Sequence, residues 1–422
     1  MKARIFLILG ALLASLFASA QNVWTLEQCI DTALMNNRNI KQKQISKKTN
    51  EIAYQQAKLD LLPNLNASAS QGFSFGRSLM ADNTYQNTNS SQTSYGFSSG
   101  ITLFDGLRMK YNIDARMAEL KVSEAELEKI KQDIIISVST AYLQVLMNKE
   151  LLLIANDQLK LSQTKIEQRK ALVEAGKIAE GELFELLAQE SKENMNKIKA
   201  EQTLKYSMLE LAQILELQSF ENMDVIVPEN LMSTQMELIN IQNVFENAIT
   251  HRPEIKSAEF SLDKSMRDVK IAKSAYYPNL NFGVNVGGGY YNSVSVPLST
   301  NLGFNLSVPI FNKFETKNQV KTAQLNVENN KLYVENAKME LRKNIQQAYH
   351  NALAAKARWE AALVSVQSGT EAYRFVNQKY EADKANVYEL YQAKSNLAQV
   401  QSEVTQSKFE YAFRIKILEW LK

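Results

Sequence analysis

A short stretch that occurs twice constrains the fold of this chain more than any other feature. Residues 58–66 read KLDLLPNLN and residues 273–281 read KSAYYPNLN, so the two prolines lie 215 positions apart. In each copy a charged, helix-like run stops at a proline and an alternating stretch begins. Proline cannot continue a helix, and it pushes the residue before it toward an extended backbone. We therefore expect a long helix to become a β-strand at Pro63 and again at Pro278, as in a duplicated unit.

The first twenty residues have the pattern of a secretory signal peptide. Lys2 and Arg4 precede an apolar run, and Ala-Ser-Ala at its end forms a cleavage site. We expect residues 1–20 to be removed and the mature chain to begin at Gln21; a membrane anchor is the alternative. Without Lys2 and Arg4, the 48 basic residues become 46 against 45 acidic ones, so the charge does not point to nucleic acid.

Cys29 is the only cysteine, which excludes a disulfide within the chain. The residues before it, Leu26-Glu27-Gln28, are not the small residues expected before an acylated lipoprotein cysteine, so lipidation of Cys29 is disfavoured but stays open. Beyond the signal peptide, no stretch is apolar and long enough for a transmembrane helix. An exported chain of this kind is periplasmic, secreted or located in the outer membrane.

Beyond each proline the hydrophobic period changes from helical to two. From Leu65 to Phe75 the odd positions are mostly apolar, whereas the even positions are Asn, Ser or Gly. The same alternation recurs three times and predicts four strands in all, at about 64–76, 94–104, 279–291 and 300–311. Residues 77–93 are rich in Asn, Ser and Thr and are interpreted as a long exposed loop. Gly287-Gly288-Gly289 is interpreted as a tight turn.

These four strands match the wall of a transmembrane β-barrel, in which apolar residues alternate with small polar ones. A soluble amphipathic sheet is the alternative. The polar face carries no Lys or Glu, and aromatic residues gather near the strand ends, and both features favour the membrane wall. Those residues are Phe73, Phe75, Tyr95, Phe97, Tyr290 and Tyr291 at one rim, and Phe104, Tyr276, Tyr277 and Phe311 at the other.

Four strands cannot close a barrel, and an open sheet edge is not viable in lipid. The chain must therefore assemble. A dimer, trimer or tetramer would supply 8, 12 or 16 strands, and the strand count does not choose between them.

A very long helical run follows each predicted hairpin. Residues 107–174 and 314–382 would each span roughly 100 Å, and after a short turn the helices 180–217 and 387–421 return. A seven-residue hydrophobic period runs through both long helices and predicts coiled-coil packing. Its rows are Ile134, Ala141, Asn148 and Ala155, then Val138, Val145, Leu152, Leu159, Ile166 and Val173, with counterparts 207 positions later from Leu341 to Ala362 and from Ile345 to Tyr380.

The duplication divides the mature chain into a first repeat over 21–217, an equatorial connector over 218–240 and a second repeat over 241–422. We expect the connector to pack outside the helices and to hold a short strand near 225–228.

This order of elements resembles the outer-membrane efflux protein family, the TolC-like outer membrane factors, over essentially the whole mature chain. The strand exits LFDG at 103–106 and PIFN at 309–312 contribute to the resemblance. It implies a mainly α fold with a transmembrane β-barrel part, in which a homotrimer forms a 12-stranded barrel continuous with a 12-helix periplasmic tunnel in the bacterial outer membrane. It also implies a passive exit duct that docks a periplasmic adaptor (membrane fusion) protein and an inner-membrane transporter. The exported substrate and the pump class, RND, ABC or other, stay open.

The chain departs from the family in two places. Residues 313–315 read Lys-Phe-Glu where the family usually has glycines and a basic residue. The sequence also stops soon after the last predicted helix, without the family's usual C-terminal extension, from which we expect a thinner equatorial belt.

No pattern of catalytic or metal-ligating residues is present, and we expect no enzyme activity, cofactor or metal. His251 and His350 have no Cys or His at metal spacing. The candidate sites lie instead at the turns of the two helical hairpins. By resemblance, the adaptor docks on Gly176, Lys177, Ile178 and Ala179 and on Asp383, Lys384, Ala385 and Asn386.

A pore constriction is expected just beyond these turns, at Glu182, Glu185, Glu389 and Gln392. The resemblance implies acidic residues at the second-copy positions; Glu389 keeps its acid and Gln392 does not. Carboxylates repeated around an oligomer would favour cations over anions in a narrow mouth. Ordinary solvated charge at a helix end is the alternative.

Two other functions compete with an export duct. A coiled-coil scaffold or surface adhesin without a pore needs neither the small polar strand faces nor the aromatic rims. A self-sufficient porin would not need roughly 100 Å of helix.

Overall fold

The computed structural model describes residues 22–79, 83–87, 89–219, 223–227, 241–292 and 294–421. The expected signal peptide and most of the expected connector lie outside these residues. The chain forms two compact units. We call Met1–Gln42, Glu128–His251 and Met339–Lys422 the helical unit, and Lys43–Leu127 and Arg252–Lys338 the sheet unit.

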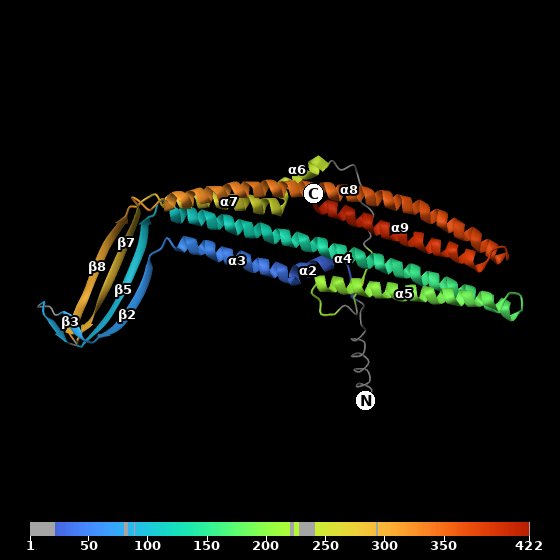
Figure 1. The fold of residues 1–422 in the computed structure, drawn as a ribbon, viewed down its shortest axis with the longest axis horizontal. Helices are drawn as coiled ribbons and strands as arrows, with labels where there is room; N and C mark the ends of the chain where they lie inside the picture. The colour runs from blue at the N-terminus through green and yellow to red at the C-terminus, as the bar shows by residue number, and fades with distance from the viewer. Residues whose placement is uncertain are drawn as a thin grey trace, which may run out of the picture. The chain divides into compact units, whose positions relative to one another are not determined.

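The sheet unit holds four long antiparallel strands (Figure 1). They are β2 (Asn64–Ser74), β5 (Ser90–Phe104), β7 (Asn279–Tyr291) and β8 (Val294–Ser307). The strand order is β2-β5-β7-β8, so each repeat supplies a hairpin and β5 pairs with β7 to join them. Within the described residues β2 and β8 each pair with one strand only, which leaves both as edges of the sheet.

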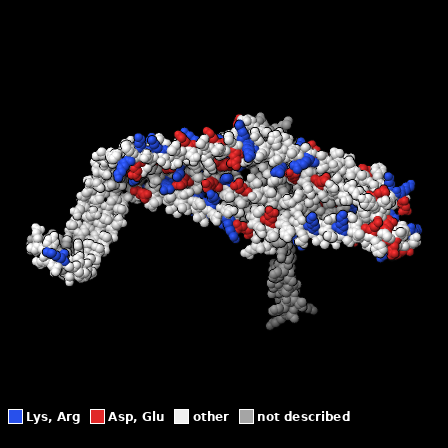
Figure 2. Space-filling view, in the orientation of Figure 1, with Lys and Arg blue, Asp and Glu red and all other residues white. Residues whose placement is uncertain are grey.

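The register gives the sheet two chemically different faces. Asn66, Ser98, Asn285 and Asn301 lie side by side across the four strands. The neighbouring row, on the opposite face, is Leu65, Ser99, Val284 and Leu302. None of the four strands contains an Asp, Glu, Lys or Arg. In Figure 2 these strands are accordingly white, whereas both charges spread over the helices.

Several strand boundaries differ from the predicted ones. The predicted loop 77–93 contains a small hairpin of β3 (Arg77–Leu79) and β4 (Tyr85–Asn87), and β5 already begins at Ser90. The last strand ends at Ser307 rather than at residue 311. Pro309 has no N–H for the ladder, although the apolar alternation continues past it.

The prediction of a turn at Gly287-Gly288-Gly289 is wrong. These residues lie inside β7, at a register shift between Gly287 and Gly289. A Cβ on Gly289 would lie 2.0 Å from the Thr93 carbonyl oxygen, so glycine is required by the close approach of the neighbouring strand.

Helices stop and strands begin at the two prolines, as predicted. Helix α3 (Arg38–Leu59) ends in a turn before Pro63, and α7 (Pro253–Ser274) ends in a turn before Pro278. β2 and β7 start at the residue after each proline. α3 ends at Leu59, four residues before Pro63, because the residues just before the proline form a tight turn.

Four helices form the two long hairpins of the repeat. They are α4 (Arg108–Glu174) with α5 (Glu180–Ile214), and α8 (Glu315–Glu381) with α9 (Val387–Leu421). The long helices have 67 residues each and the return helices 35 each. α4 starts one residue later than predicted, because Leu107 has a positive φ of 68°. α5 stops at Ile214 rather than at residue 217, because Glu216 adopts a positive φ of 54° and so cannot continue the helix.

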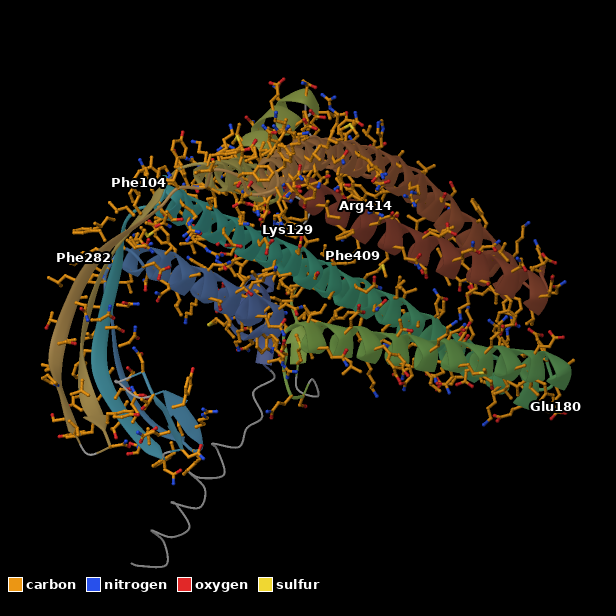
Figure 3. The ribbon with its side chains drawn as sticks, turned by 60° about the vertical axis from the view of Figure 1, so that its left-hand side comes forward. Phe104, Lys129, Glu180, Phe282, Phe409 and Arg414 are labelled. Carbon is orange, nitrogen blue, oxygen red and sulfur yellow. The ribbon has the colours of Figure 1, made fainter. Side chains whose placement is uncertain are left out.

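The predicted heptad rows form the packed faces of these helices. Every side chain in the four rows is buried or half-buried, which confirms the coiled-coil interpretation. Val138, Ala141 and Val145 of α4 belong to a core that also takes Leu211 of α5 and Phe409 of α9. Figure 3 labels Phe409 on the face of α9 that is turned toward α4.

Smaller elements complete the helical unit. β1 (Asn22–Trp24) pairs in parallel with β6 (Met223–Val225), so the short strand lies two residues earlier than predicted. The Tyr142 hydroxyl donates to the carbonyl oxygens of Trp24 and Ile226, at 2.9 and 2.6 Å, and ties this small sheet to α4. Burial raises the pKa of Tyr142 to about 12.

The helical unit also holds two short helices, α2 (Leu26–Asn36) and α6 (Ile241–His251). Cys29 on α2 is fully buried in the core, and burial raises the pKa of its thiol to about 12. Among the described helices, none combines the length and the apolarity needed to cross a lipid bilayer.

Candidate functional site at the helical tips

The two hairpins turn with the same backbone conformation, and we call these turns the tips. At the first tip the Gly176 N–H donates to the Val173 carbonyl and the Lys177 N–H to the Leu172 carbonyl, at 2.8 and 2.9 Å. At the second, 207 positions later, the Asp383 and Lys384 N–H groups make the equivalent bonds. Gly176 and Asp383 both adopt a positive φ, 69° and 52°. This paired pattern is a Schellman motif, which satisfies the last carbonyls of a helix.

Most of the residues proposed for adaptor docking are exposed. Ile178 and Ala385 are half-buried, and Ala385 packs on the core below the second tip. The Asn386 side-chain oxygen accepts the Glu389 N–H at 2.8 Å and so caps α9. Its counterpart Ala179 caps α5 without a side-chain bond.

The four residues proposed for the constriction do not share one environment. Glu185, Glu389 and Gln392 are exposed, and Gln392 donates to the Asn396 side chain at 3.4 Å. Glu182 is half-buried instead, and its carboxylate accepts a hydrogen bond from the Tyr380 hydroxyl. The structure thus separates one carboxylate that is bound between helices from three exposed polar groups.

Arg169 of α4 connects Glu182 to the second hairpin. Its guanidinium lies over the Tyr380 ring, 3.9 Å from the centroid, and donates to the Tyr380 carbonyl at 3.1 Å. Its nitrogens lie 3.7 Å from a Glu182 oxygen and 3.5 Å from an Asp383 oxygen. Arg169 is buried, so this cation joins the first hairpin to the turn of the second in a shielded position.

Tyr380 is held in its protonated form by this arrangement. Burial, and then the hydrogen bond to Glu182, raise the pKa of Tyr380 above its ordinary value of 10.0, while Arg169 opposes the shift. The neutral phenol therefore remains a donor to Glu182 at neutral pH.

A second polar cluster lies further along the same helices. The Lys394 ammonium of α9 donates to Glu193 of α5 at 2.9 Å and to the hydroxyl of Ser162 on α4 at 2.7 Å, and it also reaches the Gln158 carbonyl at 2.9 Å. Ser162 donates in turn to Glu193. Burial lowers the pKa of Lys394, and the Glu193 carboxylate opposes that shift. All three ammonium protons have acceptors, as a buried cation requires.

Sequence analysis did not identify Arg169, Ser162 or Lys394 as site residues. A signal was available, because the first heptad row continues beyond Ala155 to Ser162 and then Arg169. Polar residues at the core positions of a heptad mark buried hydrogen-bonding groups. In the second copy the same row continues to Gly369 and Val376.

The two hairpins, their identical turns and the two-faced sheet can be compared with known proteins. Residues 29–216 and 244–412, most of the chain, match the family described as outer membrane efflux protein. The chain belongs to this family. Outer membrane efflux proteins are transport channels, and this membership locates the chain in the outer membrane, with its helical part in the periplasm.

Individual relatives agree with the family. The "Toxin and drug export protein A" of Aggregatibacter actinomycetemcomitans is 21% identical over 400 residues, which cover 91% of this chain and 83% of that protein. The Campylobacter jejuni CmeC outer membrane channel superposes with a TM-score of 0.81 at 18% identity, covering 94% of this chain and 85% of the channel. The outer membrane protein VceC from Vibrio cholerae gives 0.78 at 15% identity, covering 94% and 95%. The fold expected from the resemblance is thus confirmed at the level of an efflux channel.

Proposed function

We propose that three copies of this chain form an outer-membrane exit duct that conducts substrates passively from a periplasmic adaptor and an inner-membrane transporter to the exterior. The observation that carries the proposal is the four-stranded sheet with two free edges. Its strands carry no charge and separate an apolar face from an amide- and hydroxyl-bearing face. Edges without partners are not viable in lipid, so β8 of one copy would pair with β2 of the next.

In this arrangement the apolar rows with Leu65 and Leu302 face lipid and the rows with Asn66 and Asn301 face the lumen. Three copies give 12 strands, within the range of known membrane barrels. The first repeat over 21–217, the connector over 218–240 and the second repeat over 241–422 then each occur three times around the axis.

Substrate entry is assigned to the tips. Glu185 and Glu389 are exposed, and repeated three times they would concentrate negative potential at a narrow mouth. Glu182 contributes less, because Arg169 and Tyr380 already engage its carboxylate. The exposed turn residues next to these acids are the surface on which an adaptor would dock.

Insertion mutagenesis tests the docking surface and the duct together. Two residues inserted after Gly176 should abolish complementation of an efflux-deficient strain while the protein still reaches the outer membrane as an oligomer. An insertion that leaves export intact would contradict the docking role. Loss of the oligomer would indicate a folding defect, and substitution of Lys177 and Lys384 by Glu then provides the test without altering the turn.

Ion selectivity tests the constriction. In planar bilayers the double variant Glu185→Gln with Glu389→Gln should lose most of the preference for cations over anions. Glu360→Gln, a variant on α8 more than twenty residues before the turn, is the matched control and should keep it. Unchanged selectivity in the double variant would contradict the proposed role of these carboxylates.

A further inference from the structure

Both repeats place lysines at matching positions where the helices meet the sheet. Lys58 and Lys273 each lie five residues before the proline that precedes the first strand of their hairpin. Lys110 and Lys317, 207 positions apart, lie in the first turn of the helix that follows each hairpin. Figure 3 labels Phe104, the last residue of β5, at this end of the sheet. The sequence around these lysines differs between the repeats, but the four positions are the same.

These four lysines are exposed, and within the described part of the chain none of them forms an ion pair with a carboxylate. Lysines further from the sheet on α3 behave differently. Lys43 and Lys47 pair with Glu126 and Glu124 of α4, at 2.6 and 3.0 Å. The ammonium groups next to the sheet are therefore available to an anion from outside the chain.

Positive charge is in excess at this end of the sheet. We call this region the basic belt, and it consists of residues 58–62, 105–110, 273–277 and 308–317. The belt contains six Lys or Arg residues and three Asp or Glu residues, whereas the rest of the mature chain has a small excess of acidic residues.

The acidic residues of the belt do not cancel its lysines. Asp105 is buried and lies 3.5 Å from Arg108, so these two charges offset each other. The exposed acids are Asp60 and Glu315, and each accepts a hydrogen bond from a glutamine side chain. Lys313 is exposed as well, so five exposed lysines outnumber two exposed carboxylates in every copy.

Exposed apolar side chains lie in the same belt. Ile310 and Phe311 are 95% and 72% exposed, and they follow the apolar alternation of β8 beyond its last residue. The rings of Phe311 and Phe314 contact edge to face with 5.7 Å between centroids, and the Lys317 ammonium lies 5.6 Å from the Phe314 centroid. The other exposed apolar residues of the belt are Leu61, Leu62, Leu107, Tyr276 and Tyr277. Aromatic rings beside lysines are typical of the zone between hydrocarbon and water, where a lysine stem lies in apolar surroundings and its ammonium among headgroups.

We propose that the basic belt binds the headgroups of anionic phospholipids in the periplasmic leaflet of the outer membrane. The helical part of the chain lies in the periplasm, so this end of the sheet lies at the level of that leaflet. The inference rests on the proposed duct, in which the sheet spans the bilayer. The exposed apolar side chains contact the acyl chains, and the lysines donate to the phosphate oxygens. A zwitterionic headgroup carries its own ammonium, so it gains less from the belt than phosphatidylglycerol does.

Lipid binding to the purified oligomer in detergent tests the proposal. Native mass spectrometry, with phosphatidylglycerol and phosphatidylethanolamine titrated in separate experiments, gives the affinity for each lipid. Phosphatidylglycerol should bind at least about tenfold more tightly, because each basic residue near an anionic headgroup contributes on the order of fivefold. Added salt should reduce this preference.

Substitution of the four repeated lysines shows whether they carry the preference. The belt variant combines Lys58→Gln, Lys110→Gln, Lys273→Gln and Lys317→Gln, and it should lose most of the preference for phosphatidylglycerol. Arginine at the same four positions should keep it. The matched control removes the same charge from exposed lysines of the helical unit and should also keep the preference; it combines Lys170→Gln, Lys199→Gln, Lys205→Gln and Lys343→Gln.

The outcomes separate this inference from the proposed function. Equal binding of both lipids by the wild type, or an unchanged preference in the belt variant, would overturn the inference and leave the duct standing. Displacement of phosphatidylglycerol by excess inorganic phosphate would also overturn it, because the site would then take free anions. In planar bilayers of zwitterionic lipid the belt variant should keep the wild-type conductance, and a changed conductance would place the lysines in the lumen instead. A protein that neither oligomerises nor inserts into bilayers would overturn both proposals.

Discussion

The two copies of the helical hairpin share one backbone but differ in side-chain chemistry. The helices are equal in length, and both turns are Schellman motifs at matching positions. Where the first copy has Gly176 in the left-handed conformation, the second has Asp383, whose carboxylate lies near Arg169. The duplicated backbone is thus retained, while polar groups have been placed where the two hairpins of one chain meet.

The exits from the sheet show the same divergence. Gly106 and Leu107 adopt positive φ angles of 67° and 68°, and Lys313 and Phe314 repeat the conformation at 54° and 63°. A Cβ on Gly106 would lie 2.7 Å from the Ser274 carbonyl oxygen, whereas Lys313 is exposed. The departure of residues 313–315 from the family pattern therefore leaves the turn geometry unchanged. It places a charged residue in a backbone conformation that favours glycine.

The largest effect should come from the polar cluster of Lys394, Ser162 and Glu193. In the second hairpin the positions of Ser162 and Glu193 are held by Gly369 and Val400, which contact each other without polar groups. Lys394→Leu leaves the buried Glu193 carboxylate without its cation and should lower the free energy of unfolding by about 3–5 kcal/mol. Replacing Ser162 by Gly and Glu193 by Val as well copies the second hairpin, and it should recover most of the loss. Thermal unfolding followed by circular dichroism measures both variants. A triple variant as unstable as the single one would show that the apolar contact of the second hairpin cannot replace the polar cluster of the first.

Tyr380 has no polar counterpart, because the matching position of the first copy is Val173. Tyr380→Phe removes the hydrogen bond to the Glu182 carboxylate and should lower the free energy of unfolding by about 1.5–3 kcal/mol. The tyrosine pKa gives the effect a pH signature. An unfolded phenol ionises near 10.0 and the folded one only above that value. The stability that the Tyr380 hydroxyl contributes is therefore fully present below pH 10 and is lost as pH rises through the pKa of the folded state.

Tyr142 and Tyr391 also have raised pKa values, so the difference between wild type and Tyr380→Phe is the quantity to measure. Titration by tyrosinate absorbance alongside unfolding would do so. If the stability difference between the two proteins stayed constant above pH 10, the role of the Tyr380 hydroxyl would be refuted.

The two tips should respond unequally to substitution at the left-handed residue. Gly176→Ala introduces a Cβ at a positive φ and should cost about 1–2 kcal/mol, although no atom lies near that position. Asp383→Gly relieves the same strain but removes an ion pair at an exposed side chain, which is worth only about 0–1 kcal/mol. The net change at Asp383 should be close to zero. Equal losses of stability at both positions, measured by chemical unfolding, would contradict the expected relief of backbone strain at Asp383.

Helix capping gives the smallest and most symmetrical comparison. Asn386→Ala removes the cap of α9 and should destabilise it by about 1 kcal/mol, whereas Ala179→Asn adds the missing cap to α5 and should stabilise it by a similar amount. Hydrogen exchange at Glu182 and Glu389, the residues three positions after each cap, reports the two effects separately. Opposite signs are expected, and changes of the same sign would contradict the equivalence of the two helix starts.

Elements with a strong local signal could be predicted from the sequence. The long helices were located to within one residue at each end, because Gly and Pro are nearly absent inside them and turn residues bound them. The prolines likewise predicted the strand starts at Asn64 and Asn279. The strand ends and the pairing of β1 with β6 could not be predicted, because they depend on partners that are remote in sequence.

The candidate site was predictable in outline only. The tips follow from their turn residues, but a buried arginine or lysine on a helix has the same sequence signature as a solvated one. Arg169 and Lys394 are recognisable only once α9 is known to lie against α4 and α5. The prediction of a turn at Gly287 to Gly289 is wrong for a related reason. Three consecutive glycines indicate a turn locally, but here the absence of side chains lets the neighbouring strand approach closely.

The number of copies in the assembly tests the account most directly. The protein should be extracted from purified outer membranes with mild detergent, and its mass determined by native mass spectrometry with cross-linking as a check. We predict a heat-labile particle of three chains, which supplies the 12 strands needed to pair every β2 edge with a β8 edge. A soluble single chain, or a membrane-bound single chain without partners, would contradict the duct.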